Sequence, residues 1–299
     1  WSVGVLQDEL LALYPALCAG EAVPLAELPV QYADFALWQA GELAGGRQKE
    51  LESFWRERLA GAPAYMRLPY DREPAAGAGW EGDTHSFALD AELNDGLRAV
   101  ARDEGCTPFM VLLAAYKVLL HRLTGETDIV VATPVAGRNH PSFDQLIGFF
   151  VNNLVLRTDL GGEPGFREVL RRVRETVLDA QDHQDLPFDM LVAATRPPRK
   201  LGRTPYTEVW FAFNRSQRFE RALEDISFST EEYTQDRDSV RHDFTLDVCA
   251  DEDTMQATLL CRDGMYSRTE IAEFMALWKE ILVAGLRSPD RPIRELIAD

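Results

Sequence analysis

Two histidine-containing segments hold the side chains best spaced for proton transfer. His140 is followed by Asp144, and a carboxylate four residues after a histidine could orient it as a general base on a helix. Pro141 directly follows His140 and disfavours helical geometry there, so we interpret this segment as a polar loop. His183 lies at the end of a predicted helix, and Pro187 starts another. We favour capping over catalysis for His183, because the helix dipole stabilises a charged histidine at the helix C-terminus.

Polar side chains near two predicted strands form a second group of candidate site residues. Arg138 follows the buried strand predicted over 128–135, where a guanidinium could hold a carboxylate through two hydrogen bonds or simply be solvated. Asn152, Asn153 and Arg157 interrupt an otherwise apolar run, and buried polar groups of this kind must find hydrogen bonds. They could therefore pin the structure as readily as contact a substrate.

The spacing of apolar residues predicts helices interleaved with strands. The first helical segments, around 1–14, 32–38 and 51–59, are interrupted near Gly45 and Gly46. We expect an aromatic stripe in this region to pack in a core, and it consists of Trp1, Tyr32, Phe35 and Trp38.

The remaining elements predict an α/β sandwich with mostly antiparallel late strands. A stretch rich in proline, alanine and glycine, over 68–79, is predicted to be a linker and a boundary. Further helices are predicted over 91–103, from 108 onward, over 164–182 and over 269–286, and strands over 85–89, 128–135, 149–156, 207–213, 226–233, 243–250 and 254–262.

Composition excludes several classes of partner. The 299 residues carry a net charge of −18, which repels phosphate backbones and anionic lipids, so neither nucleic acid nor a membrane is expected as a partner. The four cysteines are scattered, and the sequence shows no signal peptide and no bilayer-spanning stretch, so we expect a cytoplasmic protein. No metal-ligand or nucleotide-binding motif is present. The sequence opens at Trp1 in a helical pattern, and we expect a piece of a longer protein.

Several motifs follow one another in a recognisable order. Together the sequence resembles the C-terminal two-thirds of a condensation domain of nonribosomal peptide synthetases. The matching blocks are WSVGVL at 1–6, which looks like the helix after the family's His-His-x-x-x-Asp-Gly motif, YADFALWQ at 32–39, IGFFVNN at 147–153 with Arg157, HQDLPF at 183–188 and the looser RTPY at 203–206.

The resemblance implies a V-shaped pseudo-dimer of two chloramphenicol-acetyltransferase-like α/β lobes. On this basis 1–72 ends the N-terminal lobe, and 73–299 forms the C-terminal lobe. The strands from Thr207 onward and the loop 215–221 would supply the latch that crosses to the first lobe, and 138–145 would form the floor loop of the tunnel.

The resemblance also implies an activity, that of an acyltransferase in antibiotic-type secondary metabolism. It would join aminoacyl or peptidyl thioesters into an amide, and the thioesters would be carried on phosphopantetheine arms of donor and acceptor carrier proteins. Other synthetase domains and the missing N-terminal lobe are the further partners, with no directly bound cofactor and no metal. The family's active-site motif is expected just before Trp1, so we expect this chain alone to be inactive.

Residue roles come from the same resemblance. Arg138 is the first candidate to pair with the motif's aspartate and Arg157 the second, while Asn214 could hydrogen-bond near the reacting thioester. Tyr206 stands where the family has leucine and Asn214 where it often has glutamine, so the pocket near them is expected to be unusual. The structural and tunnel candidates are completed by Trp1, Asn152, Asn153, His183, Gln184 and Asp185.

Two other functions remain open on the sequence. The parent protein could be a catalytically inactive condensation-like platform that recruits a tailoring enzyme, or a relative that performs epimerisation or heterocyclisation. The residues before Trp1 would separate the first alternative from condensation. The HQD block at 183–185 and the VNN block at 151–153 look more like those of ordinary condensation domains.

Overall fold

A six-stranded mixed sheet forms the centre of the molecule. The computed structural model describes residues 1–69, 82–215, 220–223, 226–229, 241–251 and 254–296. The strand order is β1-β8-β7-β4-β2-β3, and a separate antiparallel hairpin pairs β5 with β6. The strands are β1 (Gly82–Leu89), β2 (Asp128–Val135), β3 (Asn152–Asp159), β4 (Val209–Arg215), β5 (Glu220–Leu223), β6 (Ile226–Ser229), β7 (Phe244–Ala250) and β8 (Met255–Arg262).

The late strands are mostly antiparallel, as predicted, and β4 is an exception. This strand runs parallel to both of its neighbours, β2 and β7, whereas β7 with β8, β8 with β1 and β2 with β3 are antiparallel. Parallel neighbours require long crossover connections, and the chain provides them. Strand β3 and two α-helices lie between β2 and β4, and the hairpin β5–β6 lies between β4 and β7.

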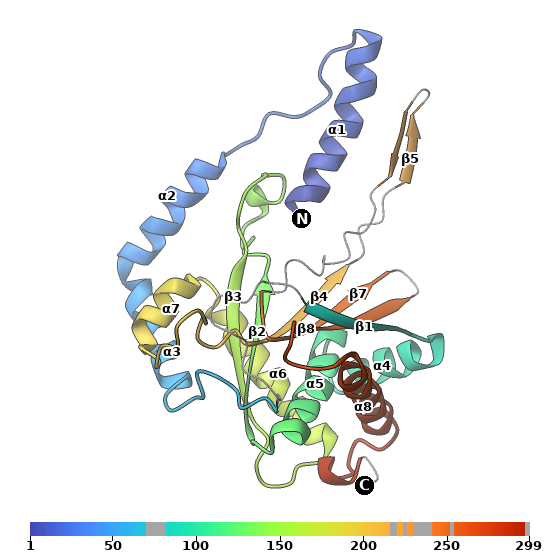
Figure 1. Cartoon of the computed structure of the whole chain (residues 1–299). Helices are drawn as coiled ribbons and strands as arrows, with labels where there is room; N and C mark the ends of the chain where they lie inside the picture. The colour runs from blue at the N-terminus through green and yellow to red at the C-terminus, as the bar shows by residue number, and fades with distance from the viewer. Residues whose placement is uncertain (70–81, 216–219, 224–225, 230–240, 252–253, 297–299) are drawn as a thin grey trace.

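Helices α4 (Ala91–Asp103), α5 (Pro108–Thr124), α6 (Phe166–Asp182) and α8 (Arg268–Arg287) pack on the sheet and on one another (Figure 1). Helix α5 is buried continuously from Met110 to Leu120, as expected for a helix enclosed on all sides. It begins as predicted, because the Thr107 hydroxyl accepts a hydrogen bond from Met110 N and Pro108 occupies the first turn. Side chains of these helices, including Trp278 of α8, and of the sheet form the main hydrophobic core.

The N-terminal helices divide between two hydrophobic clusters. Helix α1 spans Ser2–Ala19, and α2 (Tyr32–Glu42) continues through a π-helical turn (Leu43–Arg47) into α3 (Gln48–Arg58). Gly46 has φ of 101° in that turn, so the interruption predicted there is confirmed. Leu51 and Trp55 of α3 belong to the main core, whereas Phe35 of α2 packs with Phe143, Leu146 and Phe150 in a second cluster.

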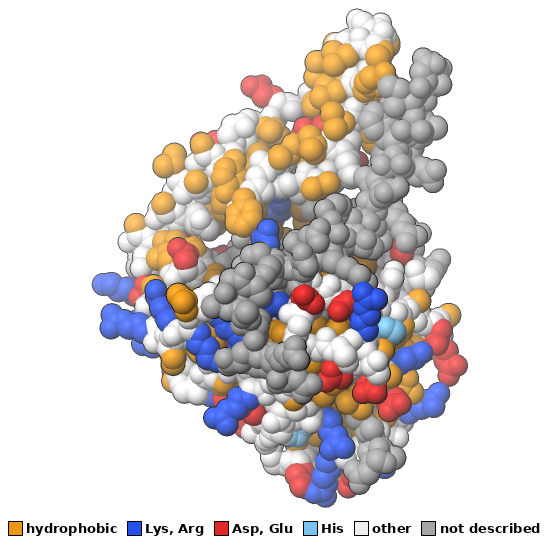
Figure 2. Space-filling view, viewed as in Figure 1, with side chains coloured by type: hydrophobic (Ala, Val, Ile, Leu, Met, Phe, Trp, Pro, Cys, Tyr) orange, Lys and Arg blue, Asp and Glu red, His pale blue; other side chains and the backbone are white. Residues whose placement is uncertain are grey.

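The core prediction for the aromatic stripe holds only for Phe35. Trp1, which precedes α1, is 57% exposed. Tyr32 and Trp38 are also exposed, because only one side of α2 meets the second cluster. Figure 2 shows hydrophobic side chains spread over α1 and α2, while charged side chains gather on the body below them.

Other predicted boundaries mostly agree with the structure. Strand β3 begins at Asn152 instead of Phe149, because its partner β2 ends at Val135, opposite Asn152. The predicted boundary falls largely in 70–81, and much of the latch falls in 216–219 and 230–240, all outside the described residues. The end of the predicted loop 215–221 forms the start of β5 instead.

In the described part of the chain, no single helix is long and apolar enough to cross a membrane. Helices α4 and α5 together have the length and composition, but they meet at an angle of 103°.

Candidate functional site

The connection between β2 and β3 (136–151) contains the predicted floor loop and is closed at its base by a glycine. Gly137 has φ of 65°, a conformation that side-chain-bearing residues avoid. A Cβ at this position would lie 1.9 Å from the carbonyl oxygen of Phe150. Only glycine therefore allows the two ends of the connection to approach so closely, directly beside Arg138.

Arg138 reaches from this base to the N-terminus of α1. Its Nη2 donates to the Ser2 hydroxyl (2.8 Å) and to the Leu146 carbonyl (2.9 Å), and its Nη1 donates to the Phe143 carbonyl. The guanidinium lies 4.1 Å from the centre of the Phe150 ring and 5.5 Å from that of Trp1. Partial burial lowers the pKa of Arg138, with Asp144 opposing the shift, and arginine remains a cation.

The Ser2 hydroxyl connects Arg138 to the far end of the β2–β3 connection. It donates to the Gly148 carbonyl (2.8 Å) and lies 3.2 Å from Gly148 N, which donates to it. The indole of Trp1 donates to the Asp144 carbonyl (2.8 Å). The hydrogen-bond acceptors of Arg138 among the described residues are all neutral oxygens, and the Asp144 carboxylate is close enough to favour its charged form.

His183 ends α6, as predicted, and its side chain packs against neighbouring helices. Its backbone N–H bonds back into α6, and its Nδ1 lies 2.7 Å from the Asp179 carbonyl. Its ring stacks on Phe54 with 3.5 Å between ring centres, and its carbonyl accepts from the Trp55 indole (3.0 Å). The ring is thus held between α6 and α3.

Asn152 fixes the α6–α7 turn (183–187), which leads into α7 (Phe188–Thr195). Its side-chain Nδ2 donates to the carbonyls of Gln184 and Leu186, both at 2.8 Å, and its Oδ1 accepts from Phe188 N at 3.0 Å. The amide group therefore satisfies three backbone groups of the turn. It acts as the structural pin that the sequence allowed.

A small cavity of about 80 Å³ lies between α2, the β2–β3 connection and this turn. Asn139, the residue after Arg138, donates a hydrogen bond to the Asp185 carboxylate at its edge. The lining includes Trp38, Gly137, Asn139, Asn152, Gln184 and Asp185.

A family model described as a condensation domain matches residues 1–298. The chain belongs to the condensation domain family. It is 39% identical over 293 residues to a linear gramicidin synthase of Brevibacillus parabrevis, a match covering 98% of this chain and 6% of that protein. It is 43% identical over 256 residues to phosphinothricin tripeptide synthetase PhsC of Streptomyces viridochromogenes, covering 85% of this chain and 23% of that protein. The chain thus spans a small part of these relatives.

Solved condensation-like structures have the same fold. The X-domain from teicoplanin biosynthesis superposes with a TM-score of 0.87 at 27% identity, covering 100% of this chain and 69% of that one. The SgcC5 protein from Streptomyces globisporus gives 0.79 at 31% identity, covering 98% of this chain and 67% of that one. The four-domain synthetase AB3403 shares the fold with a TM-score of 0.85 at 23% identity, covering 100% of this chain and 24% of that one. The predicted chloramphenicol-acetyltransferase-like α/β fold is confirmed.

Arg157 of this condensation domain has a different role from Arg138. Its Nε and Nη2 bind the two carboxylate oxygens of Asp128, each at 2.9 Å, and Nη1 donates to the carbonyls of Arg58 (3.0 Å) and Ala60 (2.9 Å). The hydrogen bond with Asp128 raises the pKa of Arg157. These partners join β2, β3 and the end of α3, so the guanidinium of Arg157 is already engaged by its own neighbours.

Three further candidates lie apart from Arg138. Asn153 pairs with Pro134 in the β2–β3 ladder. Asn214 is exposed on β4 and donates to Asp247 (3.0 Å). Tyr206 is buried with φ of 67°, and its N–H donates to the Ala64 carbonyl (2.8 Å). None of these contacts joins the three residues to Arg138 or to the residues that bind it.

The sequence analysis assigned no role to two residues beside Arg138, namely Ser2 and Asn139. Ser2 was part of a matched block, but a serine at a helix start usually signals a cap and gives no hint of a partner 136 residues away. Asn139 falls within the predicted floor loop (138–145), and no role is predicted for it. The one available signal was its position directly after Gly137 and Arg138 at the end of a buried strand.

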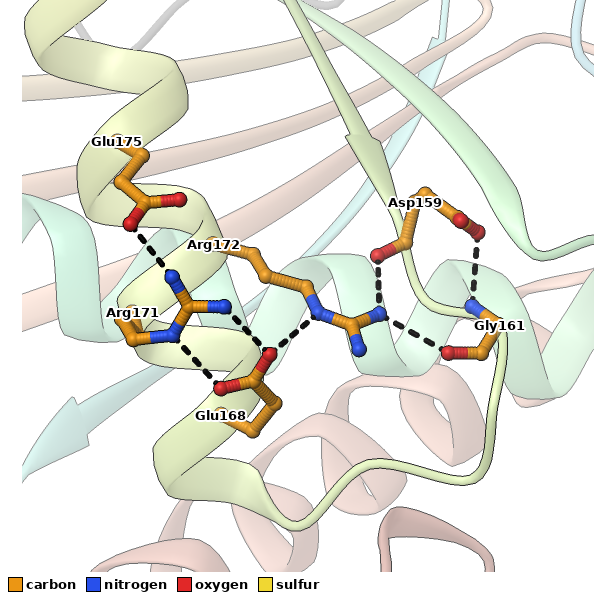
Figure 3. A network of polar contacts seen from close by, with 6 residues as sticks. All are labelled: Asp159, Gly161, Glu168, Arg171, Arg172 and Glu175. Atoms are coloured by element: carbon orange, nitrogen blue, oxygen red, sulfur yellow. Dashed lines mark hydrogen bonds and ion pairs between the residues drawn. The ribbon is translucent and has the colours of Figure 1, made fainter.

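A much larger cleft, of about 610 Å³, lies at the opposite end of β3, and most of the charged side chains that line it have ion-pair partners, as in Arg157–Asp128 and Arg58–Asp179. Figure 3 shows part of this region, with the Glu168 carboxylate between Arg171 and Arg172. Arg172 also donates to the carbonyls of Asp159 and Gly161, both at 2.9 Å, and so anchors the start of α6 to the end of β3. The Arg138 region is therefore the candidate functional site. The described residues contain no group of three or more side chains able to hold a metal ion.

Proposed function

We propose that this chain holds the end of the first lobe (1–72) and the second lobe (73–299) of a condensation domain that forms amide bonds between aminoacyl or peptidyl thioesters. The thioesters would be carried on phosphopantetheine arms of donor and acceptor carrier proteins in a larger, cytoplasmic synthetase. An N-terminal lobe and other synthetase domains would complete the machinery. Family membership and relatives that are peptide synthases support this proposal.

The position of Arg138 carries the proposal. Its guanidinium lies at Ser2, at the start of the helix that resembles the one after the family's His-His-x-x-x-Asp-Gly motif. An aspartate a few residues before Ser2 could reach this cation and form an ion pair through a donor that the Ser2, Phe143 and Leu146 bonds leave, on Nε or Nη1. Arg138 would then hold the motif against the second lobe as a positioning residue, and Arg157, already bound to Asp128, would not compete.

The reaction itself balances without a cofactor. The acceptor amine attacks the donor thioester carbonyl, so that a C–N bond forms, the C–S bond breaks, and the donor arm leaves as a thiol. The proton lost by the amine would pass to the thiolate, with a histidine of the expected motif as the base or the positioning group. Since this chain would supply the surrounding lobe and not that histidine, it is expected to be inactive alone.

The proposal is tested with the condensation domain that includes the preceding segment, supplied with loaded carrier proteins. Arg138→Ala is expected to lower the rate of amide formation by about 100-fold, because a lost positioning contact of roughly 3 kcal/mol has that effect. Arg171→Ala removes an arginine that is exposed on α6 and serves as the matched control. Equal rates for the two variants would contradict the role of Arg138.

A second function is favoured by a specific comparison. The X-domain of teicoplanin biosynthesis, which superposes well on this chain, also has a structure in complex with OxyB. This chain could likewise belong to an inactive platform that recruits a tailoring enzyme. Absence of any amide product from the complete domain, together with stable binding of a tailoring enzyme in gel filtration, would favour that alternative.

Product mass also separates the other two alternatives from condensation. Epimerisation would leave the mass of the carrier-bound substrate unchanged, and heterocyclisation would give a product lighter by one water than the simple amide.

A further inference from the structure

Two adjacent residues at the start of the floor loop bind partners on different elements. Arg138 contacts the start of α1 through Ser2, whereas Asn139 donates to Asp185 in the α6–α7 turn. Gly137, just before them, is fixed against the Phe150 carbonyl. With its base fixed in this way, the loop cannot change the position of Asn139 without also moving Arg138.

The turn that holds Asp185 is itself anchored from two sides. Asn152 binds three backbone groups on either side of Asp185, at Gln184, Leu186 and Phe188. The first residue of the turn, His183, is stacked on Phe54 and bound to α3. Asp185 is thus the end of a rigid support, and Asn139 is the point where the floor loop attaches to it.

From this arrangement we propose that Asp185 is a positioning residue, which acts through Asn139 to hold the floor loop with the Arg138 guanidinium at the start of α1. We name this contact the Asn139–Asp185 clasp. The inference rests on the proposed function, because that function gives Arg138 the role of holding the active-site motif. It assigns to the third residue of the HQD block a mechanical role that needs no contact with substrate.

The chemistry of the pair suits this role. A carboxylate accepting from an amide N–H forms a charge-assisted hydrogen bond, stronger than a neutral one. Two further donors of Arg138 bind the carbonyls of Phe143 and Leu146, both in the same connection, so the loop holds the guanidinium in place. The clasp would fix the loop, and the loop would fix the cation.

The first test compares single variants in the complete condensation domain with loaded carrier proteins. Asp185→Ala and Asn139→Ala are each expected to lower kcat about tenfold while leaving KM for the carrier proteins unchanged. Asp189→Ala is the matched control, because Asp189 is an exposed aspartate in the first turn of the neighbouring α7. A loss of kcat equal to that of the control would overturn the proposal.

The second test exchanges the partners. Asn139→Asp alone places two carboxylates together and is expected to lower kcat more than either alanine variant. The double variant Asn139→Asp with Asp185→Asn restores an amide–carboxylate pair and is expected to recover kcat to within about threefold of the wild type. If the double variant is no better than Asn139→Asp, the two residues act separately and the clasp is wrong.

Hydrogen exchange separates failure of the clasp from failure of the proposed function. Backbone amides of the floor loop are expected to exchange faster in Asn139→Asp and to return to the wild-type rate in the double variant. That result without amide formation by the wild type would retain the clasp and reject the proposed activity. Unchanged exchange in every variant would overturn the clasp even if the enzyme is active.

Discussion

Replacement of Lys117 tests whether a lysine buried in the main core makes the stability of the protein depend on pH. This lysine lies fully buried in α5, and its Nζ donates to the carbonyls of Ile129 (3.2 Å) and Leu156 (2.6 Å) on two neighbouring strands. Burial lowers its pKa from 10.5 to about 7; Asp128 opposes the shift and Arg58 adds to it. The folded protein therefore binds fewer protons than the unfolded chain between these two values.

The sign and size of the effect follow from linkage. Since the unfolded chain binds more protons in this range, the free energy of unfolding rises with pH between about 7 and 10.5. The two pKa values give a gain of about 2 kcal/mol between pH 7 and pH 9 from this side chain. Lys117→Met keeps a chain of similar shape and removes the titration.

The assay is urea unfolding of the wild type and of Lys117→Met at both pH values. We expect the wild type to gain about 2 kcal/mol more than Lys117→Met from pH 7 to pH 9. Lys49→Met, at an exposed position of α3, serves as the control and should follow the wild type. Equal gains in the wild type and in Lys117→Met would refute the argument that this buried lysine titrates near neutrality.

Three further variants test local features. Burial lowers the pKa of His242 to about 4, so the protein should lose stability as pH falls from 6.5 to 4; His242→Phe, which keeps the stacking on Trp210, should flatten this acid profile in melting experiments. Gly137→Ala should destabilise the protein by at least about 2 kcal/mol, because its Cβ would collide with the Phe150 carbonyl at a positive φ; a melting temperature equal to the wild type would contradict this. Asn152→Ala should cost about 2 kcal/mol in urea unfolding, since three partly buried backbone groups would lose their partner, and unchanged stability would show that water replaces the amide.

Local patterns were sufficient to predict most elements. The range 91–103 is helical as predicted, and the β-branched run 128–135 is a strand with the same bounds, because apolar spacing and capping residues act over short distances. The predicted start of β3 was wrong by three residues, since that boundary depends on where β2 ends. Similarly, the parallel pairing of β4 depends on connections far along the chain.

The site was predictable as a set of blocks but not as a geometry. The glycine and arginine after a buried strand, and the HQD block, lie in the loop and the turn that form the candidate site. Nothing in the sequence shows that Asn139 and Asp185 meet, because they are 46 residues apart and the contact depends on the whole β2–β3–α6 arrangement. For the same reason Arg157 could be separated from Arg138 only once its bonds to Asp128 were visible.

The most direct test of the proposed function is the mass of the product released when the complete condensation domain, with its preceding segment, receives loaded donor and acceptor carrier proteins. The proposed function predicts a single new species on the acceptor carrier, whose mass equals the sum of both substrates joined by an amide, and a free thiol on the donor carrier. Its formation should depend on Arg138. Unchanged masses on both carriers, with a folded domain and intact loading, would contradict amide formation by this domain.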